Sequence, residues 1–153
     1  MKLRYSLLFL AFLFLISCDR KYISSIPDYP VYLELDLNFE DKDLIPIQAY
    51  KIFTEKNINQ RIERVGYGGI LVYHGLSNTA SDAYFAFDIS CPHESSRTVT
   101  VEVDESRVYA ICPKCDSKFE LLNGIGNRIS GPTDEYLKSY QVSVNGNRIT
   151  VRN

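Results

Sequence analysis

Two short groups of metal-binding residue types constrain the fold of this chain more than any other feature. Cys91 and His93 are separated by one residue, and Cys112 and Cys115 enclose a two-residue gap. Thiolate sulfur and imidazole nitrogen are the ligands that zinc and iron–sulfur centres take from proteins. The two pairs supply four candidate ligands, so the fold is expected to bring them together around one metal centre.

The residues between the two pairs show the pattern of a β-hairpin. Valines at 99, 101 and 103 alternate with polar residues, and a turn at 104–106 leads into 107–111. Alternation with a period of two predicts a strand, so residues 94–111 should form a hairpin that joins two ligand loops. The ligand pairs then lie at neighbouring loop tips, and the strands fix their separation.

Most of the remaining domain also has the pattern of short strands. Strands are predicted at residues 31–37, 69–73, 84–89, 118–122, 140–144 and 148–151. Asn145-Gly146, between the last two, is a strong signal for a tight hairpin turn. Residues 55–65 fit either a short helix or a long turn. Together the pattern predicts an all-β fold, an antiparallel sandwich or small barrel with a hairpin subdomain that carries the ligands.

The N-terminus has the features of a processing signal. Lys2 and Arg4 precede an apolar run over 7–16, which is short against the roughly 20 apolar residues that span a bilayer. The tetrapeptide at 15–18, Leu-Ile-Ser-Cys, resembles the lipobox of bacterial lipoproteins, in which cleavage before the cysteine is followed by its lipidation. An ordinary secretory peptide or an uncleaved anchor, with Cys18 incidental, is the alternative.

The lipoprotein resemblance implies three regions in the chain. Residues 1–17 would be the signal peptide, 18–30 a lipidated tether and 31–153 one folded domain. Several acyl chains on Cys18 would anchor the protein stably, whereas a single chain binds marginally. We therefore expect a location in the cell envelope, on the periplasmic side of the inner membrane or on the outer membrane.

The number of cysteines favours a metal site over a disulfide framework. The chain has four cysteines, and lipidation of Cys18 would leave an odd number in an oxidising compartment. The alternative is a Cys112–Cys115 disulfide with Cys91 free. Residues 116–122 predict a turn and a strand, however, and not the helix that would lower the pKa of a redox-active thiol.

The two ligand pairs and the residues after them resemble the cluster loops of the Rieske iron–sulfur family. Cys-Pro-His at 91–93 and Cys-Pro-Lys-Cys at 112–115 correspond to that family's Cys-x-His and Cys-x-x-His loops. The similarity continues to the loop at 131–132, which covers the cluster in the family, and to the final hairpin. It extends over residues 31–153.

The Rieske resemblance implies a [2Fe–2S] cluster with an altered ligand set. Cys91 and Cys112 correspond to the thiolate ligands of one iron, and His93 to an imidazole ligand of the other. Cys115 stands where the family has its second histidine, so it matches by position only. An added thiolate makes the centre more negative, which should lower the potential toward about −400 mV from the Rieske range of about −150 to +300 mV.

The resemblance also assigns residues around the cluster. Ser117 corresponds to a residue whose hydroxyl donates to a bridging sulfide, and Phe119 stands where some members have a tyrosine donor. Gly131 and Pro132 correspond to the covering loop. Ser96 and Lys114 stand where some members have the two cysteines of a disulfide that joins the loops, so that link is absent.

Zinc is the alternative metal for the same four residues. A site with three cysteines and one histidine is a standard structural zinc site, and ligand identity does not separate it from a cluster. With zinc, the protein would be a structural or interaction lipoprotein.

The favoured interpretation is a membrane-anchored protein that transfers one electron at a time to or from a redox partner protein. The sequence has no paired carboxylates or Ser/His/Asp arrangement, so we do not expect it to act as an enzyme alone, although it could be a subunit of an oxidoreductase. A net charge of −2 without a basic stripe argues against nucleic acid as a partner. His74 is expected to be structural, and Glu40, Asp41 and Asp43 to form a solvated turn.

Overall fold

The chain folds into two antiparallel sheets. The computed structural model describes residues 24–76 and 84–153, and these contain strands and one short 3-10 helix, η1 (Lys42–Leu44). No α-helix occurs within those residues, so the prediction of an all-β fold is confirmed. In the same residues, no helix is long and apolar enough to span a membrane. The predicted signal peptide and Cys18 lie outside the described residues.

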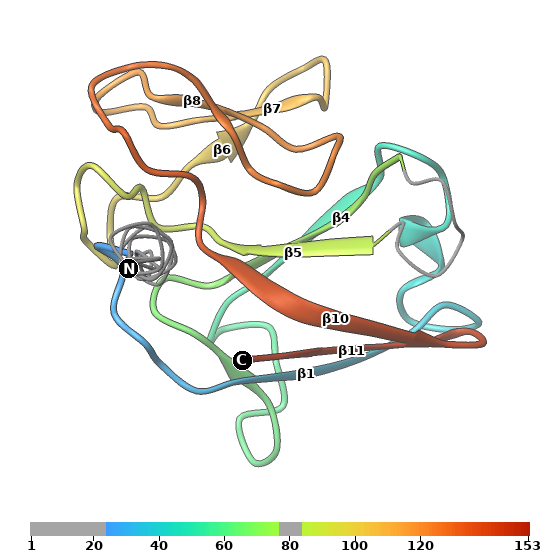
Figure 1. Cartoon of the computed structure of the whole chain (residues 1–153). Coiled ribbons are helices and arrows are strands. Elements are labelled where there is room, and N and C mark those ends of the chain that lie inside the picture. The colour runs from blue at the N-terminus through green and yellow to red at the C-terminus, as the bar shows by residue number, and fades with distance from the viewer. Residues whose placement is uncertain (1–23, 77–83) are drawn as a thin grey trace, which may run out of the picture.

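The larger sheet has seven strands and curls into a near-closed barrel. Its order is β2-β4-β5-β10-β11-β1-β3, with every neighbouring pair antiparallel. In Figure 1, β4 and β5 cross above β10, β11 and β1. The strands are β1 (Val31–Asp36), β2 (Tyr50–Phe53), β3 (Arg64–Val65), β4 (Ile70–His74), β5 (Tyr84–Asp88), β10 (Ser139–Asn145) and β11 (Arg148–Arg152).

Alternating side chains fill the inside of this barrel. Val31, Leu33 and Leu35 of β1 are buried, while the residues between them face outward or are half-buried. They join Ile149 and Val151 of β11 in one apolar cluster with residues from β3, β4, β5 and β10. Burying each such side chain contributes about 1.5–3 kcal/mol, so the alternation that predicted the strands also closes the barrel around its core.

The β10–β11 hairpin is confirmed as predicted. Asn145 pairs with Arg148, and Gly146 in the turn has φ +59°. The left-handed region costs glycine little, which is why Asn-Gly predicts this turn so well.

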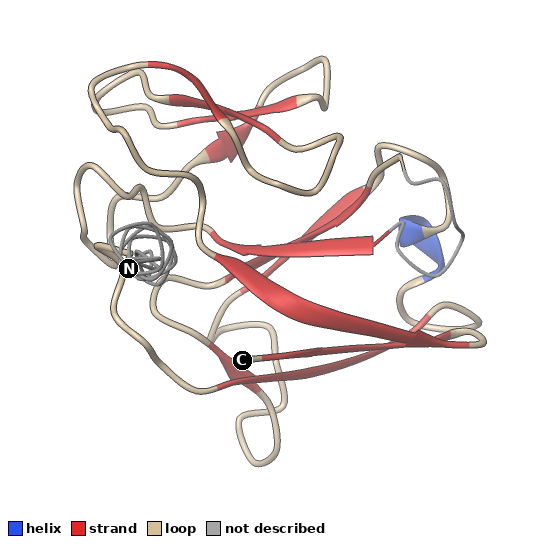
Figure 2. Ribbon diagram, in the orientation of Figure 1, coloured by secondary structure: helices blue, strands red, loops and turns tan. Residues whose placement is uncertain are grey.

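The smaller sheet carries the ligand loops. It has four antiparallel strands in the order β6-β7-β8-β9 and lies above the barrel in Figure 1; Figure 2 shows how short these strands are. They are β6 (Glu102–Val103), β7 (Tyr109–Ile111), β8 (Lys118–Glu120) and β9 (Arg128–Ser130). The predicted hairpin between the cysteine pairs is β6–β7, although its first strand is shorter than expected and residue 100 makes only an isolated bridge to Ser90.

A second apolar cluster joins the two sheets. Leu71 and Phe87 from the barrel pack in the same cluster as Phe119 and Leu121 from the smaller sheet. Cys91 and Cys112 belong to this cluster as well. The ligand loops therefore rest on a core that both sheets share.

A buried carboxylate fixes the chain before the first ligand loop. Asp88, fully buried at the end of β5, accepts hydrogen bonds from the backbone N–H groups of Tyr67 (3.0 Å), Gly68 (3.2 Å) and Ser90 (2.8 Å). The Tyr140 hydroxyl donates to it at 2.7 Å. Burial and the negative charge of Asp88 raise the pKa of Tyr140, so this hydroxyl keeps its proton. Four donors from three segments of the chain thus meet on one side chain.

The structure tests three sequence expectations for residues outside the ligand loops. The prediction of a solvated acidic turn is wrong for Asp41, which is buried and forms an ion pair with Lys51 at 2.9 Å. Its carboxylate also accepts a hydrogen bond from the Asp36 N–H. Residues 55–62 form turns, not a helix, and lead into β3. His74 is structural as expected: it stacks on Tyr84 at 4.3 Å.

We predict that Asp88→Ala lowers the free energy of unfolding by about 3–5 kcal/mol, because several donors lose a shared partner and each unsatisfied group costs about 1–3 kcal/mol. Equilibrium unfolding in urea measures this. Asp134→Ala is the control: its side chain is almost fully exposed, and surface changes usually stay within about 0.5 kcal/mol. Equal effects of the two substitutions would contradict the role given to Asp88.

Candidate metal centre

The first ligand loop is a tight turn directly after the barrel. The Cys91 N–H donates to the Val99 carbonyl at 3.0 Å, and the Cys91 carbonyl accepts from the Ser95 N–H at 2.9 Å. Ser95 has φ +47°, which closes the turn in the left-handed region. The loop therefore projects from a fixed base next to the smaller sheet.

The second ligand loop is the turn between β7 and β8. The Cys112 N–H donates to the Ser117 carbonyl at 2.9 Å, and the Asp116 N–H donates to the Cys112 carbonyl at 3.0 Å. Asp116 has φ +58°, a conformation that aspartate tolerates better than most residues. These bonds hold Cys112 and Cys115 on the inner side of the turn.

The two loops bring three sulfur atoms together. The Sγ atoms of Cys91, Cys112 and Cys115 all lie within 4.8 Å of one another, and those of Cys91 and Cys115 are 3.6 Å apart. Cys91 and Cys112 are buried, Cys115 is half-buried, and all three are free thiols. The structure thus gathers three of the four sequence-predicted ligands, and it does not contain the Cys112–Cys115 disulfide considered as an alternative.

His93 is placed differently from the three cysteines. Its ring nitrogens are not among the atoms that lie within 4.8 Å of one another, and the residue is exposed. It is nevertheless held on the same loop as Cys91, two positions along the chain. His93 therefore remains a predicted ligand, on the solvent side of the sulfur group.

Burial and backbone hydrogen-bond donors change the pKa of the Cys91 thiol in opposite directions. Burial raises the pKa of its thiol to about 12, and the nearby Cys112 and Cys115 add to this. Hydrogen bonds from the backbone of Glu94 and His93 favour the thiolate and partly offset the rise. Without a cation, this sulfur keeps its proton at neutral pH.

The pKa of the Cys115 thiol is lowered, in contrast to that of Cys91. Burial raises its pKa, but hydrogen bonds from the Ser117 hydroxyl and backbone lower it more, with smaller contributions from Cys112 and Cys91, and the net pKa is below its usual value. The buried Ser117 Oγ lies 3.1 Å from Cys115 Sγ. Ser117 therefore acts on a ligand sulfur, which is the kind of support that tunes metal sites.

The segment at 131–132 lies against the second ligand loop. A Cβ added to Gly131 would lie 2.4 Å from the Ser117 Cα, and Gly131 has φ +103°. Only glycine suits both the close approach and this backbone conformation. Pro132, the next residue, is exposed.

Phe119 forms the apolar floor of the second loop. It is fully buried on β8, opposite Ala110 of β7, in the cluster that includes Cys91 and Cys112. A phenyl ring donates no hydrogen bond, so Phe119 excludes water from the sulfur group without adding a polar partner.

An ion pair that sequence reasoning missed links the two ligand loops. The Lys114 ammonium group contacts the largely buried carboxylate of Glu94. The hydrogen bond to Glu94 and its negative charge raise the pKa of Lys114. Nothing in the sequence indicated Glu94 as the partner of Lys114.

The end of the predicted tether also contacts the first ligand loop. The Ser25 hydroxyl donates to the Pro92 carbonyl at 2.7 Å, and the Ser25 N–H donates to Glu135 at 2.8 Å. Ile26 is buried. We call residues 24–28 the N-terminal strap. A polar, proline-containing stretch gave no sequence signal for this docking.

The donor set suits a thiophilic metal. Thiolate sulfur is a soft ligand that favours zinc and iron–sulfur clusters, so three sulfurs in an apolar setting suit either centre. Among the described residues, no carboxylate belongs to this group. His93 stays a predicted fourth ligand. The residues therefore fit both metals that the sequence proposed.

Comparisons with known proteins reveal distant structural similarity. No family model matches the chain, and no curated protein matches it. One similar solved chain belongs to the complex of reduced oxygenase and oxidized ferredoxin in carbazole 1,9a-dioxygenase, with 19% identity, a TM-score of 0.47, and coverage of 80% of this chain and 93% of that one. Another is a putative NADH-dependent nitrite reductase small subunit from Mycobacterium tuberculosis, with 15% identity, a TM-score of 0.43, and coverage of 82% and 97%.

We predict that Ser117→Ala slows alkylation of Cys115 in the metal-free protein. Loss of the hydroxyl raises the pKa of Cys115, which leaves less thiolate at a given pH. The expected decrease at pH 7.5 is about threefold, a modest effect because the sulfur is partly solvated. Iodoacetamide rates, read by peptide mass spectrometry, measure it.

The unmodified protein and a matched serine variant provide the controls. In the unmodified protein, Cys115 should react fastest and Cys91 slowest, because the pKa of Cys91 is raised to about 12. Ser95→Ala removes a hydroxyl that donates to the Pro92 carbonyl within the first ligand loop. It should therefore leave the alkylation rate of Cys115, in the second loop, unchanged. A Cys115 rate that is insensitive to Ser117→Ala would contradict the assigned hydrogen bond.

Proposed function

We propose that the protein holds a [2Fe–2S] cluster on Cys91, His93, Cys112 and Cys115 and transfers single electrons to or from a partner protein in the cell envelope. The gathering of three cysteine sulfurs from two separate loops carries this proposal. When bound, such a cluster accepts or donates one electron. The residues of the chain bind it, exclude water from its inner side and set its potential.

The surroundings of the sulfurs suit electron transfer. Cys91 and Cys112 are buried in the apolar cluster that includes Phe119, which limits solvent rearrangement around the centre. His93 is exposed, so a ligand on the surface would bring the centre close to a docked partner. The partner is accordingly a redox protein that approaches the two loop tips.

The ligand set should give a low potential for a centre with a histidine ligand. A third thiolate adds negative charge and disfavours reduction, and Phe119 offers no hydrogen bond that would offset it. Ser117 and the backbone donors to Cys91 act in the opposite direction, because they stabilise negative charge on sulfur. We expect a potential between the Rieske range and about −400 mV.

A structural zinc site is the second candidate, and one distance favours it. The shortest sulfur separation, 3.6 Å, joins Cys91 and Cys115, which the Rieske pattern assigns to different irons. Two thiolates on one tetrahedral zinc, at about 2.3 Å each, lie about 3.8 Å apart. With zinc, the protein would carry no electrons, and the metal would only hold the loops together.

Metal analysis separates the two candidates. We predict that the full chain, purified anaerobically, is red-brown and holds two irons and two acid-labile sulfides per chain. Reduction should produce an electron paramagnetic resonance signal. A colourless protein with one zinc per chain would overturn the electron-transfer function.

A ligand swap provides the matched control for this measurement. Cys115→His would restore the imidazole of the Rieske pattern, remove one negative charge and raise the potential. Asp116→His, one residue along the same turn, should leave the absorption spectrum unchanged. An unchanged spectrum in Cys115→His would show that Cys115 is not a ligand.

We further propose that lipid on Cys18 attaches the protein to a membrane of the cell envelope. The proposal depends on the apolar run at 7–16 and the lipobox-like residues at 15–18. We predict that Cys18→Ser moves the protein from the membrane fraction to the soluble fraction, as immunoblotting of fractionated cells would measure. Cys112→Ser is the control cysteine variant and should stay with the membrane. Retention of Cys18→Ser in the membrane would contradict the anchor.

A further inference from the structure

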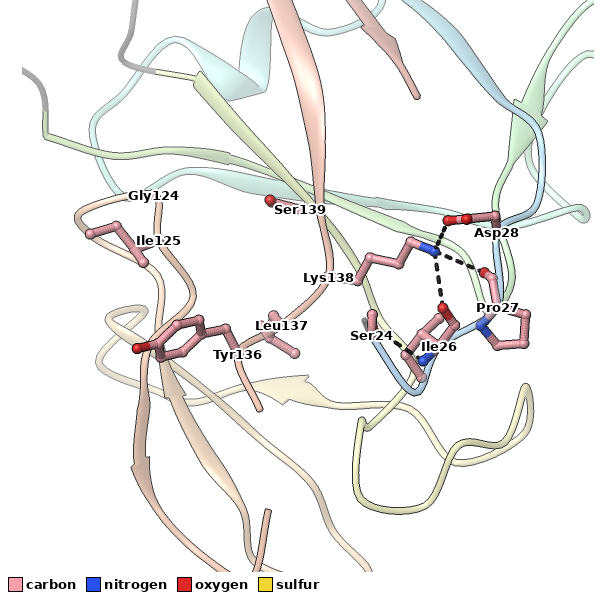
Figure 3. A pocket seen from close by; sticks show the side chains of 10 residues that line it. All are labelled: Ser24, Ile26, Pro27, Asp28, Gly124, Ile125, Tyr136, Leu137, Lys138 and Ser139. Atoms are coloured by element: carbon pink, nitrogen blue, oxygen red, sulfur yellow. Dashed lines mark hydrogen bonds and ion pairs between the residues drawn. The ribbon is translucent and has the colours of Figure 1, made fainter. Parts of the chain in front are cut away.

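A hollow of about 700 Å³ lies between the N-terminal strap and the segments that carry Ile125 and Tyr136. Figure 3 shows Ile125 and Tyr136 on one side of it and the strap on the other. Both side chains are strongly exposed for their type, 54% for Ile125 and 47% for Tyr136. Pro27 of the strap is exposed as well. The rim of the hollow therefore presents apolar surface to the outside.

The positive charge of Lys138, which lines this hollow, is balanced by an ion pair. Lys138 forms an ion pair with Asp28 at 2.6 Å and donates to the Ile26 and Pro27 carbonyls at 3.0 Å each (Figure 3). Its side chain is mostly buried. These bonds fasten the strap to the start of β10, and they leave the rim without an unbalanced charge from Lys138.

The chain that leads to the proposed lipid anchor leaves from this hollow. Ser24 is one of the residues that line it. Cys18 precedes Ser24 by six positions (24 − 18 = 6), and a fully extended chain of six residues spans at most about 20 Å. Lipid attached to Cys18 would thus hold the rim of the hollow within about 20 Å of the membrane surface.

The short connecting segment has a composition suited to a lipid surface. Arg20 and Lys21 lie between Cys18 and Ser24. Basic residues near a membrane are attracted to anionic headgroups by about 1 kcal/mol each. They would draw the segment toward the headgroups and shorten the distance between the rim and the lipid.

We propose that the face formed by Ile125, Tyr136 and the N-terminal strap rests on the lipid headgroup layer. Tyrosine is enriched at membrane interfaces, where its ring is buried and its hydroxyl stays wet. The proposal depends on the lipid anchor at Cys18 but not on which metal the site holds. A lipid surface is the favoured occupant of this face because the anchor would keep it permanently within reach.

This orientation would also set the position of the candidate metal centre relative to the membrane. The strap residue Ser25 is hydrogen-bonded to Pro92, between Cys91 and His93. The first ligand loop would therefore be held beside the membrane. A partner that exchanges electrons with the site would approach along the membrane plane.

A tryptophan scan tests the proposed face. The chain contains no tryptophan, so one introduced residue reports alone. The full lipidated chain carrying Tyr136→Trp would be reconstituted into vesicles of phosphatidylcholine and phosphatidylglycerol with brominated acyl chains. We expect at least about a twofold loss of fluorescence relative to vesicles without bromine, as for an interfacial aromatic residue.

Phe39→Trp provides the matched control. Phe39 is 73% exposed and lies next to the β10–β11 turn, where the Leu37 N–H donates to Asn147. The seven residues of β10 separate this turn from the hollow, a distance of about 20 Å. Its fluorescence should change by less than about a tenth. Circular dichroism of both variants verifies that the barrel is retained.

Four results would overturn the proposal. If Tyr136→Trp shows no quenching, or if both variants are quenched equally, the face does not select lipid. If the emission of Tyr136→Trp instead shifts with the protein-to-lipid ratio and without quenching, a second copy of the chain covers the face. If neither variant sediments with vesicles, the anchor itself is absent, whatever the metal analysis shows.

Discussion

The 3.6 Å approach of the Cys91 and Cys115 sulfurs is the contact at which the two ligand loops meet. Thiols from two loops, with Cys112 beside them, are crowded into an apolar setting, and burial there disfavours the thiolate of Cys91. The pKa of Cys91 is raised to about 12 for this reason. A metal cation reverses that balance, because it favours the thiolates that burial disfavours. The arrangement of the three sulfurs is therefore consistent with a metal-binding site.

The rest of the fold keeps those two loops in place. Asp88 ties the chain before Cys91 to the barrel, and the Glu94–Lys114 ion pair joins the loops across the site. The apolar cluster shared by the two sheets supports both loops from below. The N-terminal strap adds a further contact through Ser25. The candidate metal site, the barrel and the N-terminal strap are thus connected through a few side chains.

Sequence reasoning succeeded where the signal was local. The alternation of β1 and the Asn-Gly turn of the last hairpin each depend on neighbouring residues, and the cysteine spacing predicted the sulfur group. It failed where distant segments decide the outcome. β2 (Tyr50–Phe53) has little alternation and is ordered by pairing with β4, and Asp41 is buried because Lys51 reaches it. Nothing near Ser25 in the sequence indicates that it contacts the ligand loop.

The proposed electron-transfer function requires that His93 completes an iron–sulfur centre with the three cysteines. The chain has two histidines, and His74 lies on β4, stacked on Tyr84. Electron spin-echo envelope modulation of the reduced protein, labelled with ¹⁵N-histidine, tests the claim most directly. We predict strong coupling of the iron spin to one histidine nitrogen, which His93→Ala abolishes. A paramagnetic centre without nitrogen coupling, or no paramagnetic centre after reduction, would contradict it.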